Sequence, residues 1–261
     1  MRYLGMTFKY IFKNFIFIFF FALIPSFFFA MSTDIHNIGA VADNIVTGEF
    51  DLSFVQLFNF FSLFSLKRWP FALAAFVLTL LFMAMLLSMM EKHMRVGSRS
   101  FRDLFKRIDY NLGSTFFILL LALIAYEFWA LVTAGLCSLV VLIVTNGLAR
   151  CILGIALACG MMVLLCYLVS LFLLWLPCRQ ITGYSFMDSL SYSSQISTGK
   201  RGKIFLAGIV VTVSAFADMR PVVFLCIEII YIFVFLYYNV LMYVLFFDAN
   251  GEERLDLKKK Y

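Results

Sequence analysis

Long apolar runs separated by short polar segments dominate this sequence. A helix needs about 20 apolar residues to cross the hydrocarbon core of a bilayer. By that measure the pattern predicts six crossings, over residues 14–31, 69–90, 114–145, 151–176, 204–217 and 222–247. We therefore expect an all-α, polytopic membrane protein that forms a single transmembrane domain.

The polar segments contain shorter amphipathic patterns. Near the N-terminus, Phe8, Ile11 and Phe12 recur at helical spacing among lysines, which predicts a surface helix before the first span. Pro25 is expected to kink that span. Within the segment 32–68, apolar residues recur at i, i+3, i+4 and i+7, namely Phe54, Leu57, Phe58, Phe61 and Phe64. This pattern predicts one helix of about 13 residues that lies on a leaflet, because it is too short to cross.

The run 114–145 is longer than one crossing requires. As a straight helix it would extend roughly 48 Å, against a hydrocarbon core of about 30 Å. We expect it to tilt, to bend near Gly135, or to project beyond the membrane. Pro177 is expected to end the following run, 151–176.

Lysine and arginine are unevenly distributed along the chain. Most of the 21 cations lie in residues 1–13, 91–113, 178–203 and 248–261. Because short loops rich in Lys and Arg remain in the cytoplasm, we predict that both of these loops and both termini are cytoplasmic and that 32–68 faces outward. The tail 248–261 is expected to be mobile. The net charge of +6 then fits anionic lipid headgroups better than nucleic acid, for which no soluble basic domain remains.

The two predicted cytoplasmic loops share a pattern. Ser100–Asp103 reads SFRD and Ser185–Asp188 reads SFMD, and a glycine precedes the next span in each case. Ser followed three residues later by an acid resembles a capping box, so each loop is predicted to hold a capped surface helix. In the first loop, an apolar stripe is a candidate for docking a partner protein: Phe101, Leu104, Phe105 and Ile108.

Two acidic residues, Glu127 and Glu228, lie inside predicted spans. Charges are costly in lipid, so such residues usually face the interior of a helix bundle. Together with Arg150, Arg220, Tyr126 and Tyr231 they could line a polar cavity, suited to a proton or cation relay or to headgroup capture. The alternative is structural, either an ion pair or a hydrogen-bonded carboxyl group. A second polar cluster, Tyr237–Asn239 with Tyr243, is expected to make interhelical hydrogen bonds.

Motifs for cofactors, metals and catalysis are missing from the sequence. The six cysteines include no CxxC pair, and the two histidines fall on opposite sides of the predicted membrane. HExxH, GxSxG, Walker A and GxGxxG are all absent. We therefore expect no catalytic site, no cofactor and no metal, and a protein that is not an enzyme.

Two segments of the cytoplasmic loops resemble those of known families. They are SFRDLF at Ser100–Phe105 in the first loop and SFMDSLSYSSQISTGKRGKIFLAGI in the second. They resemble the loops of YciC-like six-span bacterial inner-membrane proteins and of the membrane domain attached to some glycerophosphodiester phosphodiesterases. The resemblance covers roughly 71–247 and departs in the segment 32–68 and the long third span. It implies a six-span fold in a bacterial cytoplasmic membrane and brings no established mechanism.

Three functions remain open at this point. The first is a non-enzymatic protein that handles lipid or assists another membrane complex. The second is the membrane subunit of an ABC-type exporter, in which a separate cytoplasmic ATPase would dock on Phe101–Ile108. The third is a proton- or ion-coupled carrier that uses Glu127 and Glu228.

Overall fold

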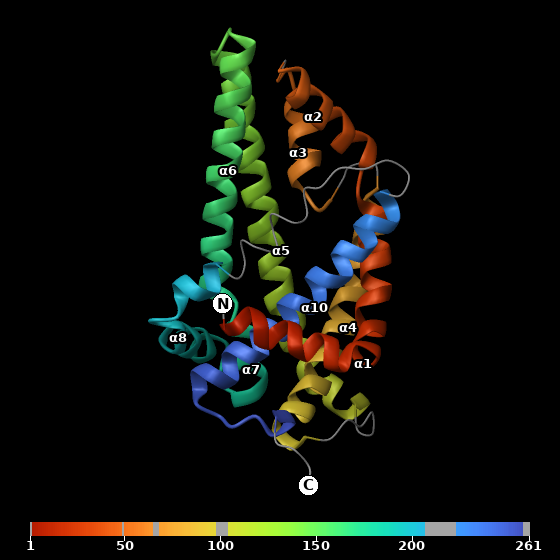
Figure 1. The fold of residues 1–261 in the computed structure, drawn as a ribbon, viewed down its shortest axis with the longest axis vertical. Coiled ribbons are helices and arrows are strands. Elements are labelled where there is room, and N and C mark those ends of the chain that lie inside the picture. The colour runs from red at the N-terminus through yellow and green to blue at the C-terminus, as the bar shows by residue number, and fades with distance from the viewer. Residues whose placement is uncertain (1, 49, 65–67, 98–103, 207–222, 258–261) are drawn as a thin grey trace.

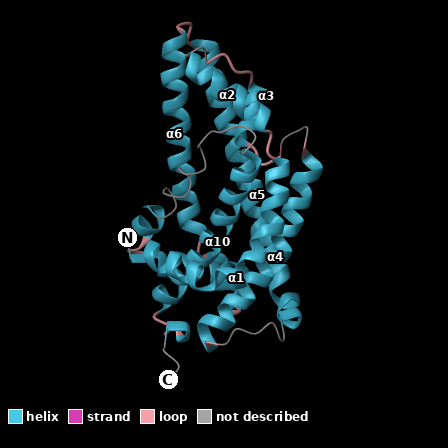
Figure 2. Cartoon of the chain, turned by 45° about the vertical axis from the view of Figure 1, so that its right-hand side comes forward, coloured by secondary structure: helices cyan, strands magenta, loops and turns pink. Residues whose placement is uncertain are grey.

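The computed structural model describes residues 2–48, 50–64, 68–97, 104–206 and 223–257 (Figure 1). At the start of three of these segments, side chains are described only from Tyr3, Asn111 and Leu225 onward. The described residues form helices joined by loops and contain no strand (Figure 2). This confirms the predicted all-α class.

Five helices are long and apolar enough to cross a membrane. They are α1 (Arg2–Ser32), α4 (Trp69–Val96), α5 (Leu104–Ile143), α6 (Gly147–Phe172) and α10 (Val223–Asn250). These helices confirm a polytopic membrane architecture. The predicted span 204–217 lies outside the described residues after Leu206, so the count of six stays a prediction.

Helices α1, α4 and α10 pack into a three-helix bundle, with α1 in contact with both of the others. The ring of Tyr231 on α10 lies against Phe29 near the end of α1. At the other end of α10, Asp248 accepts a hydrogen bond from Tyr3. Helices α1 and α10 are therefore antiparallel, and the two described chain ends lie at the same end of the bundle, which is the lower end in Figure 1. Which side of the membrane this end faces stays a prediction.

The first helix does not consist of a separate surface helix and span. Residues 2–32 form one continuous helix with Pro25 inside it. Figure 1 shows that its N-terminal part lies across the lower bundle before the helix turns upward. Lys9 and Phe12 in this part are exposed, as expected of a helix at a membrane surface.

Helices α5 and α6 form a long hairpin that rises above α4 and α10 (Figure 1). Helix α5 has 40 residues, which corresponds to roughly 60 Å. Of the three possibilities expected for this run, the structure shows projection beyond the neighbouring helices. The separate surface helix predicted before it is wrong in part, because Leu104–Ile108 belong to α5 and the helix continues through Gly113.

The segment between α1 and α4 differs from the prediction. It holds two helices, α2 (Ile35–Thr47) and α3 (Phe54–Phe61), where the sequence pattern predicted one. Helix α3 packs on α5 and buries Leu57 and Phe61, and its expected position on or dipping into the outer leaflet stays a prediction. A capping box of Ser53 and Gln56 starts α3. Leu57 and Phe61 of the predicted stripe therefore face protein, whereas Phe54 is 44% exposed. We call α2, α3 and the hairpin residues 126–166 that face them the upper unit.

The chain after α6 also corrects an expectation. Helix α6 ends at Phe172, and Pro177 lies inside the next helix, α7 (Trp175–Thr182). As the third residue of α7, Pro177 occupies a first turn, where a missing N–H removes no bond within the helix. The capped surface helix predicted in the second loop is confirmed as α8 (Phe186–Ser197), whose Ser185 side chain accepts from the Asp188 N–H. The first capping box, Ser100–Asp103, lies outside the described residues.

The predicted mobile tail is wrong as far as Leu257. After α10, a short 3₁₀ helix, η1 (Leu255–Leu257), packs against the end of α4. Arg254 and Asp256 form a buried bidentate ion pair, with side chains only 8% and 5% exposed. The Arg254 guanidinium also lies over the Tyr10 ring, 5.7 Å from its centroid. The contact with Tyr10 and the packing of η1 hold the tail against α1 and α4, and the ion pair fixes the position of Arg254 within the tail.

Candidate functional site: an apolar cavity between the bundle and the hairpin

A cavity of about 550 Å³ lies between the three-helix bundle and the α5–α6 hairpin. Its wall is built from α1, α4, α5, α6, α7 and α10, and nearly all of its side chains are apolar. We call it the central cavity. The lining residues used below are Phe29, Ala72, Thr79, Ile118, Ala122, Tyr126, Trp129, Leu176 and Met242.

A chain of buried polar groups closes the lower end of the central cavity. Gln180 on α7 donates to Thr115 Oγ1 at 3.0 Å and accepts from the Tyr243 hydroxyl at 3.0 Å. Thr115 donates to the Asn111 carbonyl, and the Asn111 amide donates to Ser88 Oγ at 2.9 Å. These bonds join α4, α5, α7 and α10 through uncharged groups. They also confirm the interhelical bond expected of Tyr243.

The side chains of this lower network do not line the cavity, but residues close to them in the sequence do. Ile118 follows Thr115 by about one turn of α5, and Met242 is the neighbour of Tyr243; both line the cavity. Because Gln180, Thr115 and Tyr243 are not in the lining, the network adds no polar group to the cavity wall. The lower end therefore suits the apolar end of a molecule.

A second polar cluster stands at the upper end. Glu127 accepts from Ser62 Oγ at 2.6 Å and from the Leu63 N–H at 2.9 Å. The neighbouring Tyr126 hydroxyl donates to the Phe61 carbonyl at 2.8 Å. Both side chains thus bind the chain where α3 ends, and Tyr126 also contributes to the cavity wall.

One polar group on the wall has no partner within the described part of the protein. The Thr79 hydroxyl is buried and makes no hydrogen bond there. Threonine inside a helix commonly bonds the carbonyl one turn earlier. The Thr79 hydroxyl oxygen is instead covered by neighbouring protein atoms, so Thr79 adds no polar group to the cavity surface.

Of the other residues of the predicted polar cavity, Tyr231 lies within electrostatic range of Tyr126, whereas Arg150 lies elsewhere. Arg150 lies near the tip of the hairpin, bonds to the Val144 carbonyl and lies 4.0 Å from Asp51. On α10, Tyr231 is 3.3 Å from the Thr33 hydroxyl, whereas half-buried Glu228 has no hydrogen bond or ion pair with another described residue. Arg220 lies outside the described residues. The structure thus pairs Glu127 with Tyr126 and places Arg150 elsewhere; a shared functional role for the set stays a prediction.

The predicted docking stripe cannot be placed as a surface. Phe101 lies outside the described residues, and Leu104, Phe105 and Ile108 belong to the first turns of α5, where only the backbone is described. Docking of a partner protein at this stripe therefore stays a prediction.

Sequence reasoning missed most of the residues that bound the central cavity. The buried network below the cavity did have a signal in the sequence. Each of its residues Asn111, Thr115 and Gln180 is a polar residue next to or within an apolar run. The cavity itself has no such signal, since its wall residues resemble those that face lipid.

Comparison with protein families, curated proteins and solved structures gave no match. The resemblance to YciC-like proteins therefore stays a prediction.

Proposed function

We propose that this polytopic membrane protein handles lipid, without catalysing a reaction, by taking a lipid hydrocarbon chain into the central cavity. The observation that carries the proposal is the cavity wall, which is almost wholly apolar between two polar clusters that satisfy themselves. A volume of about 550 Å³ falls within the range of about 300–1,000 Å³ typical of ligand pockets.

The lining favours an apolar ligand over a polar solute. None of its described residues is charged, so an ion or sugar would lose its hydration without replacement contacts. A hydrocarbon chain gives up no hydration by moving there from the bilayer, and close packing offsets the conformational freedom that it loses.

The Glu127 contacts support the structural alternative over the proton relay. Both carboxylate oxygens are engaged, one with Ser62 and the other with Leu63. A relay residue needs a neighbour to which its proton can move, whereas these contacts anchor the chain after α3. The exporter interpretation depends on the docking stripe, whose side chains are not described.

Lipid retention through purification tests the proposal. We would extract the protein in mild detergent and count bound lipids by native mass spectrometry. Ala122→Phe, which fills the central cavity from α5, is expected to retain one lipid fewer than wild type. Ala156→Phe is the matched control, because Ala156 is exposed on α6 and outside the cavity lining.

The controls separate failure of folding from failure of binding. All three proteins should elute as one symmetric peak on gel filtration. Equal lipid retention by Ala122→Phe and wild type would contradict the proposal, as would a wild type that carries no lipid under conditions in which it stays folded.

A further inference from the structure

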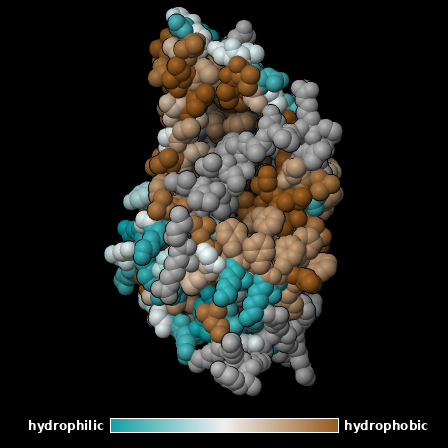
Figure 3. All heavy atoms as spheres, viewed as in Figure 1, coloured by the Kyte–Doolittle hydropathy of each residue, from teal (hydrophilic) through white to brown (hydrophobic). Residues whose placement is uncertain are grey.

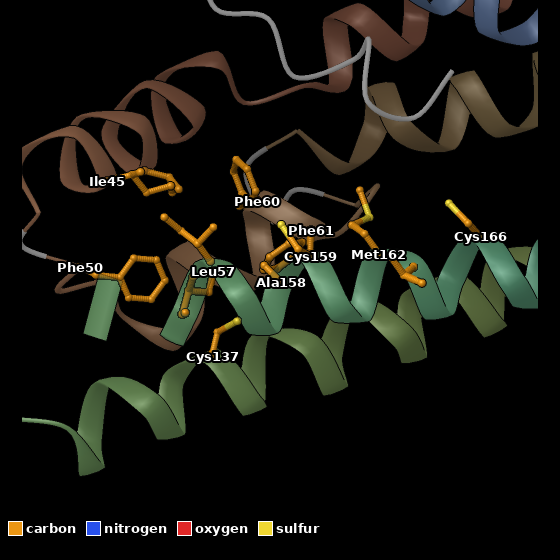
Figure 4. Close-up of a pocket in the computed structure, with 14 residues that line it drawn as sticks. Ile45, Phe50, Leu57, Phe60, Phe61, Cys137, Ala158, Cys159, Met162 and Cys166 are labelled. Carbon is orange, nitrogen blue, oxygen red and sulfur yellow. The ribbon is translucent and has the colours of Figure 1, made fainter. Parts of the chain in front are cut away.

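A second cavity, of about 430 Å³, lies in the upper unit between α2, α3, α5 and α6 (Figure 4). We call it the upper cavity. Its lining contains no charged side chain and no side-chain hydroxyl or amide. The lining residues used below are Phe50, Phe61, Ile155, Ala158, Cys159 and Val163. We propose that the upper cavity binds a second lipid hydrocarbon chain, which enters sideways from the bilayer past α6.

The first argument is the partition between the two cavities. Phe61 lines the upper cavity and Trp129 lines the central cavity. Their rings meet edge to face, with centroids 5.9 Å apart. The Trp129 N–H donates to the Met161 carbonyl at 2.9 Å, which fixes the indole between α5 and α6. The upper cavity is therefore a separate compartment with its own wall.

The second argument is the route of entry. Ile155 and Val163 line the upper cavity although they are 39% and 51% exposed, and Cys159 is also exposed. The cavity therefore opens along this face of α6. The exposed neighbours Ile152 and Leu164 are apolar as well. An opening bordered by such side chains admits hydrocarbon from a bilayer in preference to a solute from water.

The third argument is the shape of the far wall. The Phe50 ring lies so close to Gly154 that a Cβ there would come within 2.6 Å of Phe50 Cε1. This close approach lets Phe50, which is 4% exposed, close the end of the cavity against α6. Phe50 closes one end, and the lining residues follow α6 past Phe61 as far as Cys166, so the space is an elongated slot along α6 (Figure 4). A single unbranched chain fits a slot of this form.

This inference shares with the proposed function the idea that the protein binds lipid, but different residues carry it. The test uses full-length protein in vesicles that contain a phospholipid with a diazirine near the end of one acyl chain. After irradiation, cross-linked peptides are mapped by mass spectrometry. In wild type we expect cross-links on α2 and α3, whose cavity-facing side chains Val41, Ile45 and Leu57 are buried or half-buried.

Two alanines on α6 give a matched pair of variants. Ala158 lines the upper cavity, whereas Ala156 is exposed and lines neither cavity. Ala158→Phe is expected to lower the α2 and α3 cross-links at least fivefold, and Ala156→Phe to leave them unchanged. Ala122→Phe, which fills the central cavity, should also leave them unchanged, so the two sites can fail independently.

Labelling of Cys159 in the wild type adds a measurement that needs no substitution. In detergent without lipid, N-ethylmaleimide should modify Cys159, and addition of the same phospholipid should slow the modification severalfold. Cross-links confined to residues outside the upper cavity, or equal α2 and α3 cross-links in Ala158→Phe and wild type, would overturn the proposal. A Cys159 labelling rate unaffected by phospholipid would overturn it as well.

Discussion

The lower end of the three-helix bundle and the upper unit are built on different principles. In the most apolar stretches of α10 and α4, 61% and 50% of the residues are buried, against 22% in α5 and 11% in the span that contains α6. Figure 3 shows polar residues gathered at the lower end of the molecule and a largely apolar surface above it. The bundle helices α4 and α10 are therefore packed largely against other helices, whereas most residues of the hairpin are exposed.

Polar contacts at the lower end fix which helices meet. The Tyr10 hydroxyl lies 2.9 Å from His93 Nδ1, Lys200 lies 3.0 Å from Asp248, and Gln180 links Thr115 to Tyr243. In lipid, where apolar side chains gain little by leaving the solvent, such bonds are a main source of specific helix association. In the upper unit, hydrogen bonds from Tyr126, Glu127 and Trp129 are combined with aromatic packing and with the close approach of Phe50 to Gly154. That unit can therefore enclose space. We expect a substitution in the bundle to affect several helices, and a substitution in the upper unit to affect only the helix near it.

Loss of the tail ion pair should have the largest effect. Asp256→Ala leaves Arg254 buried without its carboxylate, and removal of one partner of a buried pair typically costs about 3–5 kcal/mol. We expect release of the tail, seen as faster tryptic cleavage after Arg254 and faster hydrogen exchange at the end of α4. Asp43→Ala, at an exposed acid of α2, is the control and should change neither. If Asp256→Ala and Asp43→Ala show the same cleavage rate after Arg254 and the same hydrogen exchange at the end of α4, the ion pair is not needed to hold the tail.

Gln180→Leu should destabilise the whole bundle by about 2 kcal/mol, because it leaves the Tyr243 and Thr115 hydroxyls buried with one fewer partner each. A thermal unfolding curve in detergent measures the loss. Gln195→Leu, at an exposed position on α8, makes the same change without breaking a side-chain bond described here. If both variants unfold at the wild-type temperature, the network is not what specifies the bundle.

Glu127→Gln tests whether the upper unit responds separately. Glutamine offers one acceptor oxygen where Glu127 uses two, so one bond to the end of α3 is lost, at a cost of about 1 kcal/mol. We expect faster hydrogen exchange in α3 and no change at Gln180 or Tyr243. Glu228→Gln is the matched control, since Glu228 has no polar contact with another described residue. Faster exchange throughout the bundle would mean that the two regions are coupled.

Trp129→Phe should have the smallest effect. The substitution keeps an aromatic ring near Phe61 but removes the bond to the Met161 carbonyl, worth about 0.5–1.5 kcal/mol. We expect a small fall in the unfolding temperature and faster exchange in α6 near Met161. Trp69→Phe, at the exposed start of α4, serves as the control and should behave as wild type. A larger effect at Trp69 would contradict the role given to the partition.

The five long helices could be predicted from the sequence because each depends on a local run of apolar residues. The cap at Ser185 was also local, and α8 follows from it. Helix α2 was missed, although Asp34 caps its start and Gly48 ends it with φ of 72°. Its residues mix polar and apolar types without a clear run, so only these two flanking signals mark it.

The arrangement around the cavities could not be predicted, because it depends on contacts between distant segments. The burial of Phe61 requires α3 to pack on α5, and that packing is anchored by Glu127, 65 residues from Ser62. The pattern of α3 alone fits protein or lipid equally well. Likewise, nothing in the charged tail indicates that Arg254 will lie over Tyr10.

The most direct test of the central claim is a crystal structure of the protein grown from a lipidic mesophase. We predict elongated electron density in the central cavity, running past Thr79 between Tyr126 and Met242 and fitting one hydrocarbon chain. A well-ordered cavity wall around space without such density, or a wall collapsed so that α4 and α5 close the cavity, would contradict the account.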